Sequence, residues 1–320
     1  MVDVRSPLVR RFWWRAAQVG LSAVLIVWVL SGLDAESVAE ARKLSSDRLL
    51  LALVLLALSQ VWGGIRLWLL LRRQGSALGY GTVLRLTWFG FFTSNFLPGP
   101  VGGDVAKGAL LIRSGLGAKI VVAALVADRL VNMATMIGVT AGCIVAGRLG
   151  MLLTAGHSSL PALWAVVGFA VLIPWSPAWL RRAGNPTGMS RLGALVRAYL
   201  DIARLWLTWP VGLALALLLS GASVLSVVLG QFVLLRDLGV GLGLLDFIAV
   251  IGLVYIVTLV PISLNGLGVR EAGLVFLLGV VGTDRHAATV FAVVVRVLMV
   301  VISIPGAFSM ISLKAADRKS

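Results

Sequence analysis

The stretch SNFLPGPVGGDVAKG, from Ser94 to Gly108, interrupts a strongly apolar run with prolines, glycines, an aspartate and a lysine. Proline and glycine end helices and allow irregular backbone. In a bilayer, irregular backbone is tolerated only where protein or a water-filled cavity covers it. If the flanking chain lies in a membrane, this stretch therefore predicts a broken helix beside a polar pocket.

The composition places the chain in a membrane. Of its 320 residues, 59% are hydrophobic and 13% are charged, whereas soluble domains carry about 25% charged residues. The 28 basic residues outnumber the 13 acidic ones, and in so apolar a chain this excess indicates cytoplasmic loops and anionic lipid rather than nucleic acid. The single cysteine excludes a disulfide framework. The two histidines are far apart, so neither a metal site nor a cofactor is predicted.

Hydropathy predicts an all-α polytopic membrane protein, with residues 1–320 forming a single integral membrane domain. Two apolar regions, 80–113 and 246–281, are each interrupted near the middle, which predicts two broken, re-entrant helical hairpins. Whether such a hairpin is re-entrant or crosses twice, it enters and leaves on the same side. Six full transmembrane helices are expected near residues 14–32, 48–71, 118–147, 160–176, 209–235 and 287–312.

The basic residues predict the orientation, with both termini in the cytoplasm of a bacterial cell and the chain in its cytoplasmic membrane. A segment at about 181–208 has arginines along one helical face, and it is either an amphipathic helix on the inner membrane surface or a solvated linker helix. The flanks assigned inside carry Arg5, Arg10, Arg11, Arg15, Arg72, Arg73, Arg113, Lys119, Arg181, Arg182, Arg191, Arg197, Arg204, Lys314, Arg318 and Lys319. Those assigned outside carry only Arg42, Lys43, Arg48, Arg148, Arg236 and Arg285.

A shift of 167 positions, which brings Leu97 onto Leu264, aligns the two interrupted regions without a gap. Both then read as an apolar helix, a Pro/Gly/Asn break, an acidic residue, and an arginine in the next full helix. The matched pairs are Pro98 with Asn265, Gly99 with Gly266, Asp104 with Glu271 and Arg129 with Arg296. Three full spans separate the hairpins, so they enter from opposite sides. The pattern predicts an inverted repeat, about 80–147 and 246–312, as in many secondary transporters.

The breaks and their charges predict a polar pocket near the membrane midplane. Asp104 is expected to cap the half-helix that GGD begins. The residues leave a second interpretation open, in which the acids only cap helices and neutralise arginines as buried structural pairs. The candidate substrate-binding residues are Asn95, Asp104, Lys107, Arg129, Asn265, Arg270, Glu271 and Arg296, and the structural breaks are Pro98, Gly99, Gly102, Gly103, Pro261, Gly266 and Gly268.

Other charged residues within the spans have simpler expected roles. Arg66 and Arg85 lie near the inner ends of their helices and are predicted to extend to the interface. Asp128 has no acidic counterpart in the second repeat, and it is either a local partner of an arginine or a proton site. Asn132 is predicted to form hydrogen bonds between helices.

The segments NFLPGPVGGDVAKG and PISLNGLGVREAGLVFLL together resemble the two signature segments of the lysylphosphatidylglycerol synthase transmembrane-region family, also called flippase-like domain proteins. The resemblance extends over residues 12–312. It implies a lipid translocase, because the bifunctional members flip an aminoacylated phosphatidylglycerol. Lys107 departs from the arginine expected there, which keeps the charge but loses bidentate phosphate geometry. The resemblance does not include the cytosolic acyltransferase domain of the bifunctional members, so it does not imply lysine transfer to lipid.

The leading functional hypothesis is a translocase (flippase) for an anionic phospholipid-type lipid or a lipid-linked glycan, including isoprenoid-linked lipids. On this hypothesis the protein is expected to be a transporter rather than an enzyme. Two alternatives stay open. One is an accessory membrane subunit that presents lipid to a partner synthase or glycosyltransferase. The other is a membrane-embedded transferase with Asp104 or Glu271 as its base.

Overall fold

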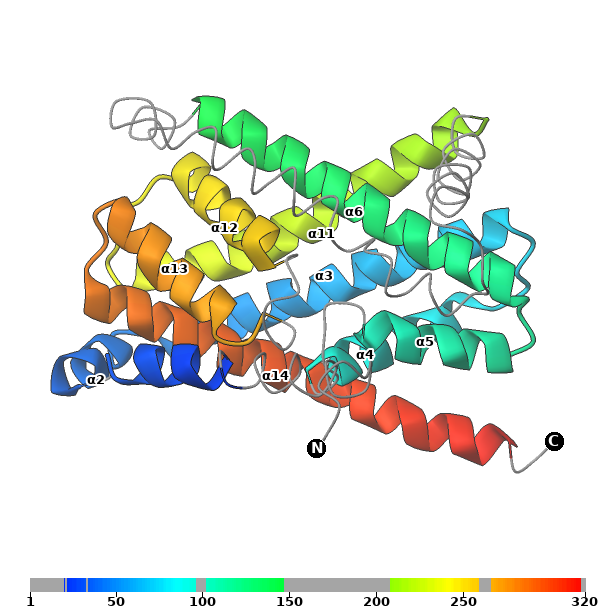
Figure 1. Ribbon diagram of the computed structural model, residues 1–320, viewed down its shortest axis with the longest axis horizontal. Helices are drawn as coiled ribbons and strands as arrows, with labels where there is room; N and C mark the ends of the chain where they lie inside the picture. The colour runs from blue at the N-terminus through cyan, green and yellow to red at the C-terminus, as the bar shows by residue number, and fades with distance from the viewer. Residues whose placement is uncertain are drawn as a thin grey trace, which may run out of the picture.

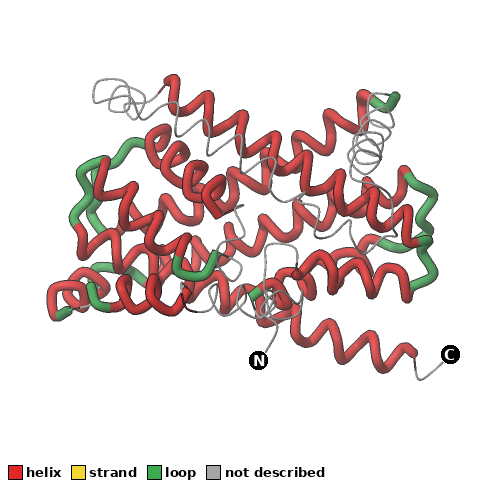
Figure 2. Tube along the Cα trace, viewed as in Figure 1, coloured by secondary structure: helices red, strands yellow, loops and turns green. Residues whose placement is uncertain are grey.

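The computed structural model describes residues 20–146, apart from 21, 33 and 96–101, and residues 208–258 and 266–317. Within these ranges the chain consists of helices and the turns between them, without a strand (Figure 2). The all-α prediction is confirmed for this part of the chain.

Four long helices are apolar enough to cross a membrane: α3 (Ser46–Arg73), α6 (Ala118–Ala146), α11 (Pro210–Asp237) and α14 (Arg285–Asp317). At 1.5 Å per residue, 28 residues extend about 42 Å, which exceeds a hydrocarbon core of about 30 Å. They match four of the six expected spans, and they make the chain a multi-pass membrane protein. The expected span 160–176 and almost all of the segment 181–208 lie outside the described residues.

The expected first span, 14–32, is described only in its second half. Residues 22–30 form a helix that is followed, after a bend of 84°, by the short helix α2 (Ala35–Ala41). Asp34 caps α2 by accepting a hydrogen bond from the Ser37 backbone N–H at 2.9 Å. The bend lies between the apolar helix and the more polar segment that begins at Asp34.

Both interrupted regions form pairs of short helices. The first pair is α4 (Tyr80–Ser94) and α5 (Gly102–Arg113), and the second is α12 (Leu244–Thr258) and α13 (Val269–Val280). The members have 15 and 12 residues in each pair, about 22 and 18 Å, which is too short to cross a hydrocarbon core of about 30 Å. Each apolar region is therefore interrupted near its middle, as the sequence predicts.

The two helix pairs approach the centre of the molecule from opposite edges (Figure 1). The connections from α3 to α4 and from α5 to α6 lie at the right edge, and those from α11 to α12 and from α13 to α14 lie at the left edge. Helix α6 runs from right to left, and α14 runs from left to right. The inner ends of both pairs thus point into the middle of the bundle.

Each of two full helices packs against the first short helix of the other pair, α6 against α12 and α14 against α4. A glycine at each crossing allows the two helices to approach closely. A Cβ atom on Gly252 would lie 1.8 Å from the Thr140 hydroxyl oxygen, and one on Gly306 would lie 2.1 Å from the Trp88 carbonyl oxygen. These crossings hold the short helices in the bundle, where their inner ends surround a cavity.

Candidate functional site

A cavity of about 400 Å³ lies where the inner ends of the short helices meet α3, α6, α11 and α14. Its described lining includes four cationic side chains, Arg66, Lys107, Arg129 and Arg270, and two acidic ones, Asp104 and Asp128. Four positive and two negative side chains leave a formal charge of two positive. An excess of buried positive charge is costly in a low-dielectric setting unless an anion compensates it.

Asp104 joins the first broken pair to the full helix that follows. It is the third residue of α5, so it lies inside the first turn and is not the N-cap that the sequence suggested. Its Oδ2 accepts a hydrogen bond from Arg129 Nε, and its Oδ1 lies 3.1 Å from Lys107 Nζ. Because both carboxylate oxygens bind cations, Asp104 holds these two side chains together at the cavity wall.

Glu271 has the corresponding position in the second pair. Its Oε1 accepts a hydrogen bond from Arg296 Nε at 2.6 Å, and its Oε2 accepts one from the Gly268 backbone N–H at 2.7 Å. Gly268 has a φ of +80°, which favours glycine. Glu271 therefore both caps α13 and neutralises an arginine.

The spacing in the sequence predicts these ion pairs but does not say which acid faces which arginine. In the structure each acid pairs with the arginine 25 residues later, Asp104 with Arg129 and Glu271 with Arg296. Only the first pair lines the cavity. Glu271 and Arg296 are not among its lining residues, although their neighbours Arg270 and Val295 are. Arg296 Nη2 is buried without a hydrogen-bond partner among the described residues.

Arg270 differs from Arg296 in both respects, its position and its partners. It lines the cavity and is half-buried, and in the described part of the chain its guanidinium forms neither a hydrogen bond nor an ion pair. Of the charged residues at the cavity it is the one best placed to receive an anion, because no carboxylate has to be displaced first.

The remaining predicted residues divide into three groups. Asn95 ends α4, where its Nδ2 donates to the Phe91 carbonyl at 3.5 Å, and it does not line the cavity. Gly103 lies so close to α4 that a Cβ atom would be 2.2 Å from the Gly90 carbonyl oxygen, and Gly266 has a φ of +74°. Gly102 begins α5. Pro98, Gly99, Pro261 and Asn265 lie outside the described residues.

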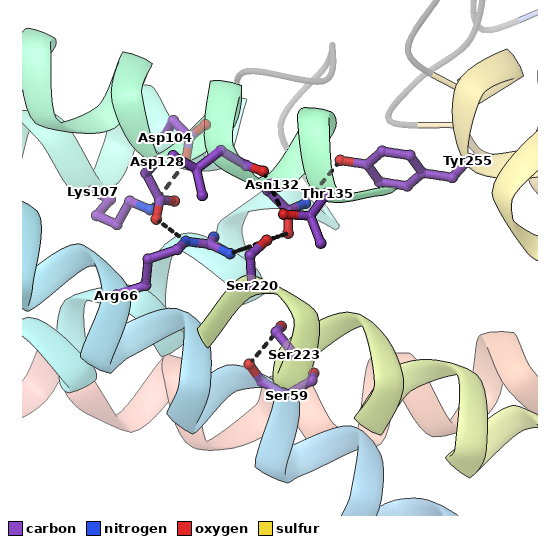
Figure 3. Close-up of polar contacts among 11 residues, drawn as sticks. Ser59, Arg66, Asp104, Lys107, Asp128, Asn132, Thr135, Ser220, Ser223 and Tyr255 are labelled. Atoms are coloured by element: carbon purple, nitrogen blue, oxygen red, sulfur yellow. Dashed lines mark hydrogen bonds and ion pairs between the residues drawn. The ribbon is translucent and has the colours of Figure 1, made fainter. Parts of the chain in front are cut away.

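Arg66 does not extend to the membrane interface as the sequence suggested. Its side chain is buried and reaches into the bundle, where Nε donates to Asp128 Oδ1 at 2.7 Å (Figure 3). Its Nη1 donates to Asn132 Oδ1 at 3.2 Å and to the Ser220 hydroxyl at 3.1 Å. The prediction was wrong because an acidic partner on α6 compensates the charge inside the bundle. Asp128 is thus a partner of an arginine, but on another helix.

Asn132 connects this network to the second broken pair. Its Nδ2 donates to the Tyr255 hydroxyl on α12 at 3.1 Å, while its Oδ1 accepts from α3 and α11. The prediction that Asn132 bonds between helices is confirmed. A signal for the network was present in the sequence, since Asp128 and Asn132 are one turn apart on the same face of a predicted span.

Helices of membrane length, with two pairs of half-length helices that meet at a cationic cavity, define a polytopic helical membrane protein. A model of the lysylphosphatidylglycerol synthase TM region matches residues 15–306. The chain belongs to this family, as its two motifs suggested. The family relates it to membrane lipids. A comparison with curated proteins finds no match.

Proposed function

We propose that the protein translocates an anionic phospholipid-type lipid across the bacterial cytoplasmic membrane, with the headgroup held in the central cavity. The observation that carries this proposal is Arg270, which lines the cavity without an ion-pair partner in the described part of the chain. A charged side chain away from the membrane surface is costly unless a partner compensates its charge. A purely structural role does not account for that cost, but a bound phosphate does.

The sequence left two interpretations open, a substrate-binding pocket and buried structural pairs, and different charged residues fit each of them. Arg66–Asp128 and Arg296–Glu271 each join one arginine to one carboxylate on another helix, and they fit a structural role. Asp104 differs because it binds two cations at once, Arg129 and Lys107, and thus leaves a surplus positive charge at the cavity. We assign headgroup binding to Lys107, Arg129 and Arg270, and orientation of the first two to Asp104.

Alternating access follows from an inverted repeat, which we propose relates residues 80–147 to residues 246–312. Two observations support it. The broken pairs enter from opposite edges of the bundle (Figure 1), and each acid pairs with an arginine 25 residues later. Rocking of one repeat against the other would open the cavity to each leaflet in turn.

The same carboxylates argue against a membrane-embedded transferase. A base must be free to accept a proton from its substrate. Both oxygens of Asp104 and both of Glu271 already accept hydrogen bonds or pair with cations. The contacts favour transport over group transfer.

Transport by the purified protein tests the proposal. We expect proteoliposomes that contain the protein to move phosphatidylglycerol with a fluorescent acyl chain between leaflets, which an impermeant quencher detects. Liposomes with an unrelated helical membrane protein serve as the control. If the purified protein binds the lipid but does not move it, the chain is an accessory subunit that presents lipid to an enzyme.

The orientation makes a separate prediction. We place the edge that carries residues 74–79 and 114–117 in the cytoplasm. In a Cys143→Ala background, Ser46→Cys at the opposite edge should react with an impermeant thiol reagent in intact cells, and Ser114→Cys should react only after permeabilisation. Both serines are exposed, so burial does not confound the comparison. Labelling of Ser114→Cys in intact cells would reverse the orientation.

A further inference from the structure

We infer that the cavity selects lipids whose headgroup is a phosphate monoester with two negative charges, and that it rejects headgroups that carry an added ammonium group. The inference rests on the proposed function and narrows its substrate from anionic lipids in general. It follows from the charge balance of the cavity, the state of its carboxylates and the positions of its cationic donors.

The charge balance favours a dianion. The described lining has four cations and two carboxylates, hence a surplus of two positive charges. One surplus charge belongs to the group formed by Asp104, Lys107 and Arg129, and the other belongs to Arg270. A phosphate diester carries one negative charge and leaves one of these uncompensated. A phosphate monoester carries about 1.5 to 2 negative charges at pH 7 and compensates both.

The donors are also arranged for a monoester. Lys107 lies on α5, Arg129 on α6 and Arg270 on α13, so cations from three helices line the same cavity. A monoester presents three terminal oxygens that accept strong hydrogen bonds. Phosphate recognition by arginine and lysine is charge-assisted. A terminal phosphate therefore has an oxygen for each of these helices, whereas a diester has only two unesterified oxygens.

The carboxylates explain the rejection of ammonium groups. Asp104 is occupied by Arg129 and Lys107, and Asp128 Oδ1 accepts from Arg66 Nε at 2.7 Å. No described carboxylate at the cavity is left to pair with an incoming ammonium group. An aminoacylated headgroup would add positive charge where positive charge is already in excess, and like charges repel.

The rest of the lining indicates an amphiphile rather than a free anion. Met133, Met136, Val224, Val227 and Met299 form apolar wall in the same cavity as the cations. Such a wall has no favourable contact to offer inorganic phosphate, but it can cover the first methylene groups of a lipid. We therefore place the phosphate at the cationic wall and the start of the tail at the apolar one.

Binding of matched lipids tests the inference. Four probes are used with the purified protein in phosphatidylcholine nanodiscs: phosphatidic acid, phosphatidylglycerol and lysylphosphatidylglycerol with identical acyl chains, and inorganic phosphate. At pH 8 we expect phosphatidic acid to bind at least about tenfold more tightly than phosphatidylglycerol, since a charged hydrogen bond is worth about a tenfold change or more. Lysylphosphatidylglycerol and inorganic phosphate should bind most weakly.

The pH dependence supplies a second readout. The second ionisation of a phosphate monoester has a pKa of about 6. Lowering the pH from 8 to 5 should therefore bring the affinity for phosphatidic acid down to that for phosphatidylglycerol, whose single charge does not change. Arg270→Gln should remove the preference at pH 8, and Arg270→Lys should retain it. Arg85→Gln is the matched control, because Arg85 is exposed and lies outside the cavity.

The outcomes separate this inference from the proposed function. Equal binding of phosphatidic acid and phosphatidylglycerol, with transport intact, overturns the inference and leaves the translocase standing. Tightest binding of lysylphosphatidylglycerol does the same. Absence of binding and transport for every lipid overturns both. If inorganic phosphate binds as tightly as phosphatidic acid, the site takes a free anion and the lipid assignment is wrong.

Discussion

Replacing Asp128 with alanine is expected to lower the free energy of unfolding by about 3–5 kcal/mol, because it leaves the Arg66 guanidinium buried without its charge partner. The side chains of this pair are 6% and 14% exposed, so solvent cannot replace the lost contact. The measurement is denaturant unfolding of the purified protein in mixed micelles. Asp128→Asn should have a smaller effect, since the amide oxygen can still accept a hydrogen bond.

The double change Arg66→Met with Asp128→Leu separates the charge from the packing. It removes both charges and leaves Asn132 and Ser220 hydrogen-bonded to each other at 3.3 Å, so most of the stability should return. The exposed pair of Lys43 and Glu40 is the matched control, and Glu40→Gln should cost no more than about 1 kcal/mol. A loss below about 1 kcal/mol for Asp128→Ala would contradict the assignment of Arg66–Asp128 as a buried structural pair.

Arg129→Gln is expected to slow lipid translocation by about ten- to a hundredfold, because a charge-assisted hydrogen bond contributes about 1.5–3 kcal/mol. The protein should stay folded, since Asp104 keeps Lys107 at 3.1 Å as a partner. Arg129→Lys should recover much of the transport, because it restores the charge. Rates are measured in proteoliposomes at equal amounts of folded protein.

Arg296, the arginine that pairs with Glu271, gives the contrast. Arg296→Gln leaves Glu271 without its cationic partner and does not alter the cavity lining. Its main effect should therefore be on stability rather than on transport per folded molecule. Wild-type transport by Arg129→Gln would remove Arg129 from the headgroup site and leave Asp104–Arg129 as a structural pair.

Much of the architecture could be predicted from the sequence. The long helices α3, α6, α11 and α14 fall within a few residues of the expected spans, because about 20 consecutive apolar residues are a local requirement for crossing a bilayer. The breaks before Gly102 and Val269 are also local features. Glycine and proline destabilise a helix through their own backbone properties, which do not depend on tertiary contacts. The segments NFLPGPVGGDVAKG and PISLNGLGVREAGLVFLL also resembled the signature segments of the family that residues 15–306 match.

The candidate site could be predicted only in part. The repeat spacing identified Asp104, Arg129, Glu271 and Arg296, and the structure brings them together in two ion pairs. It did not distinguish the pair that lines the cavity from the pair that lies behind it. The N-cap assignment of Asp104 also failed, because α5 begins two residues earlier.

What the sequence determined by itself is the membrane class, the places where helices break and the spacing of charges along the chain. These depend on hydropathy and backbone chemistry, which act over a few residues. Only the tertiary structure decided which way each charge faces. Arg66 could have extended to the interface, but the packing of α3 against α6 and α11 places it beside Asp128, Asn132 and Ser220. Arg270 and Glu271 are adjacent in sequence, yet only Arg270 lines the cavity. A charge in an apolar helix is stabilised either by water at the membrane surface or by a partner inside the bundle, and the second choice exists only once other helices have brought that partner into reach.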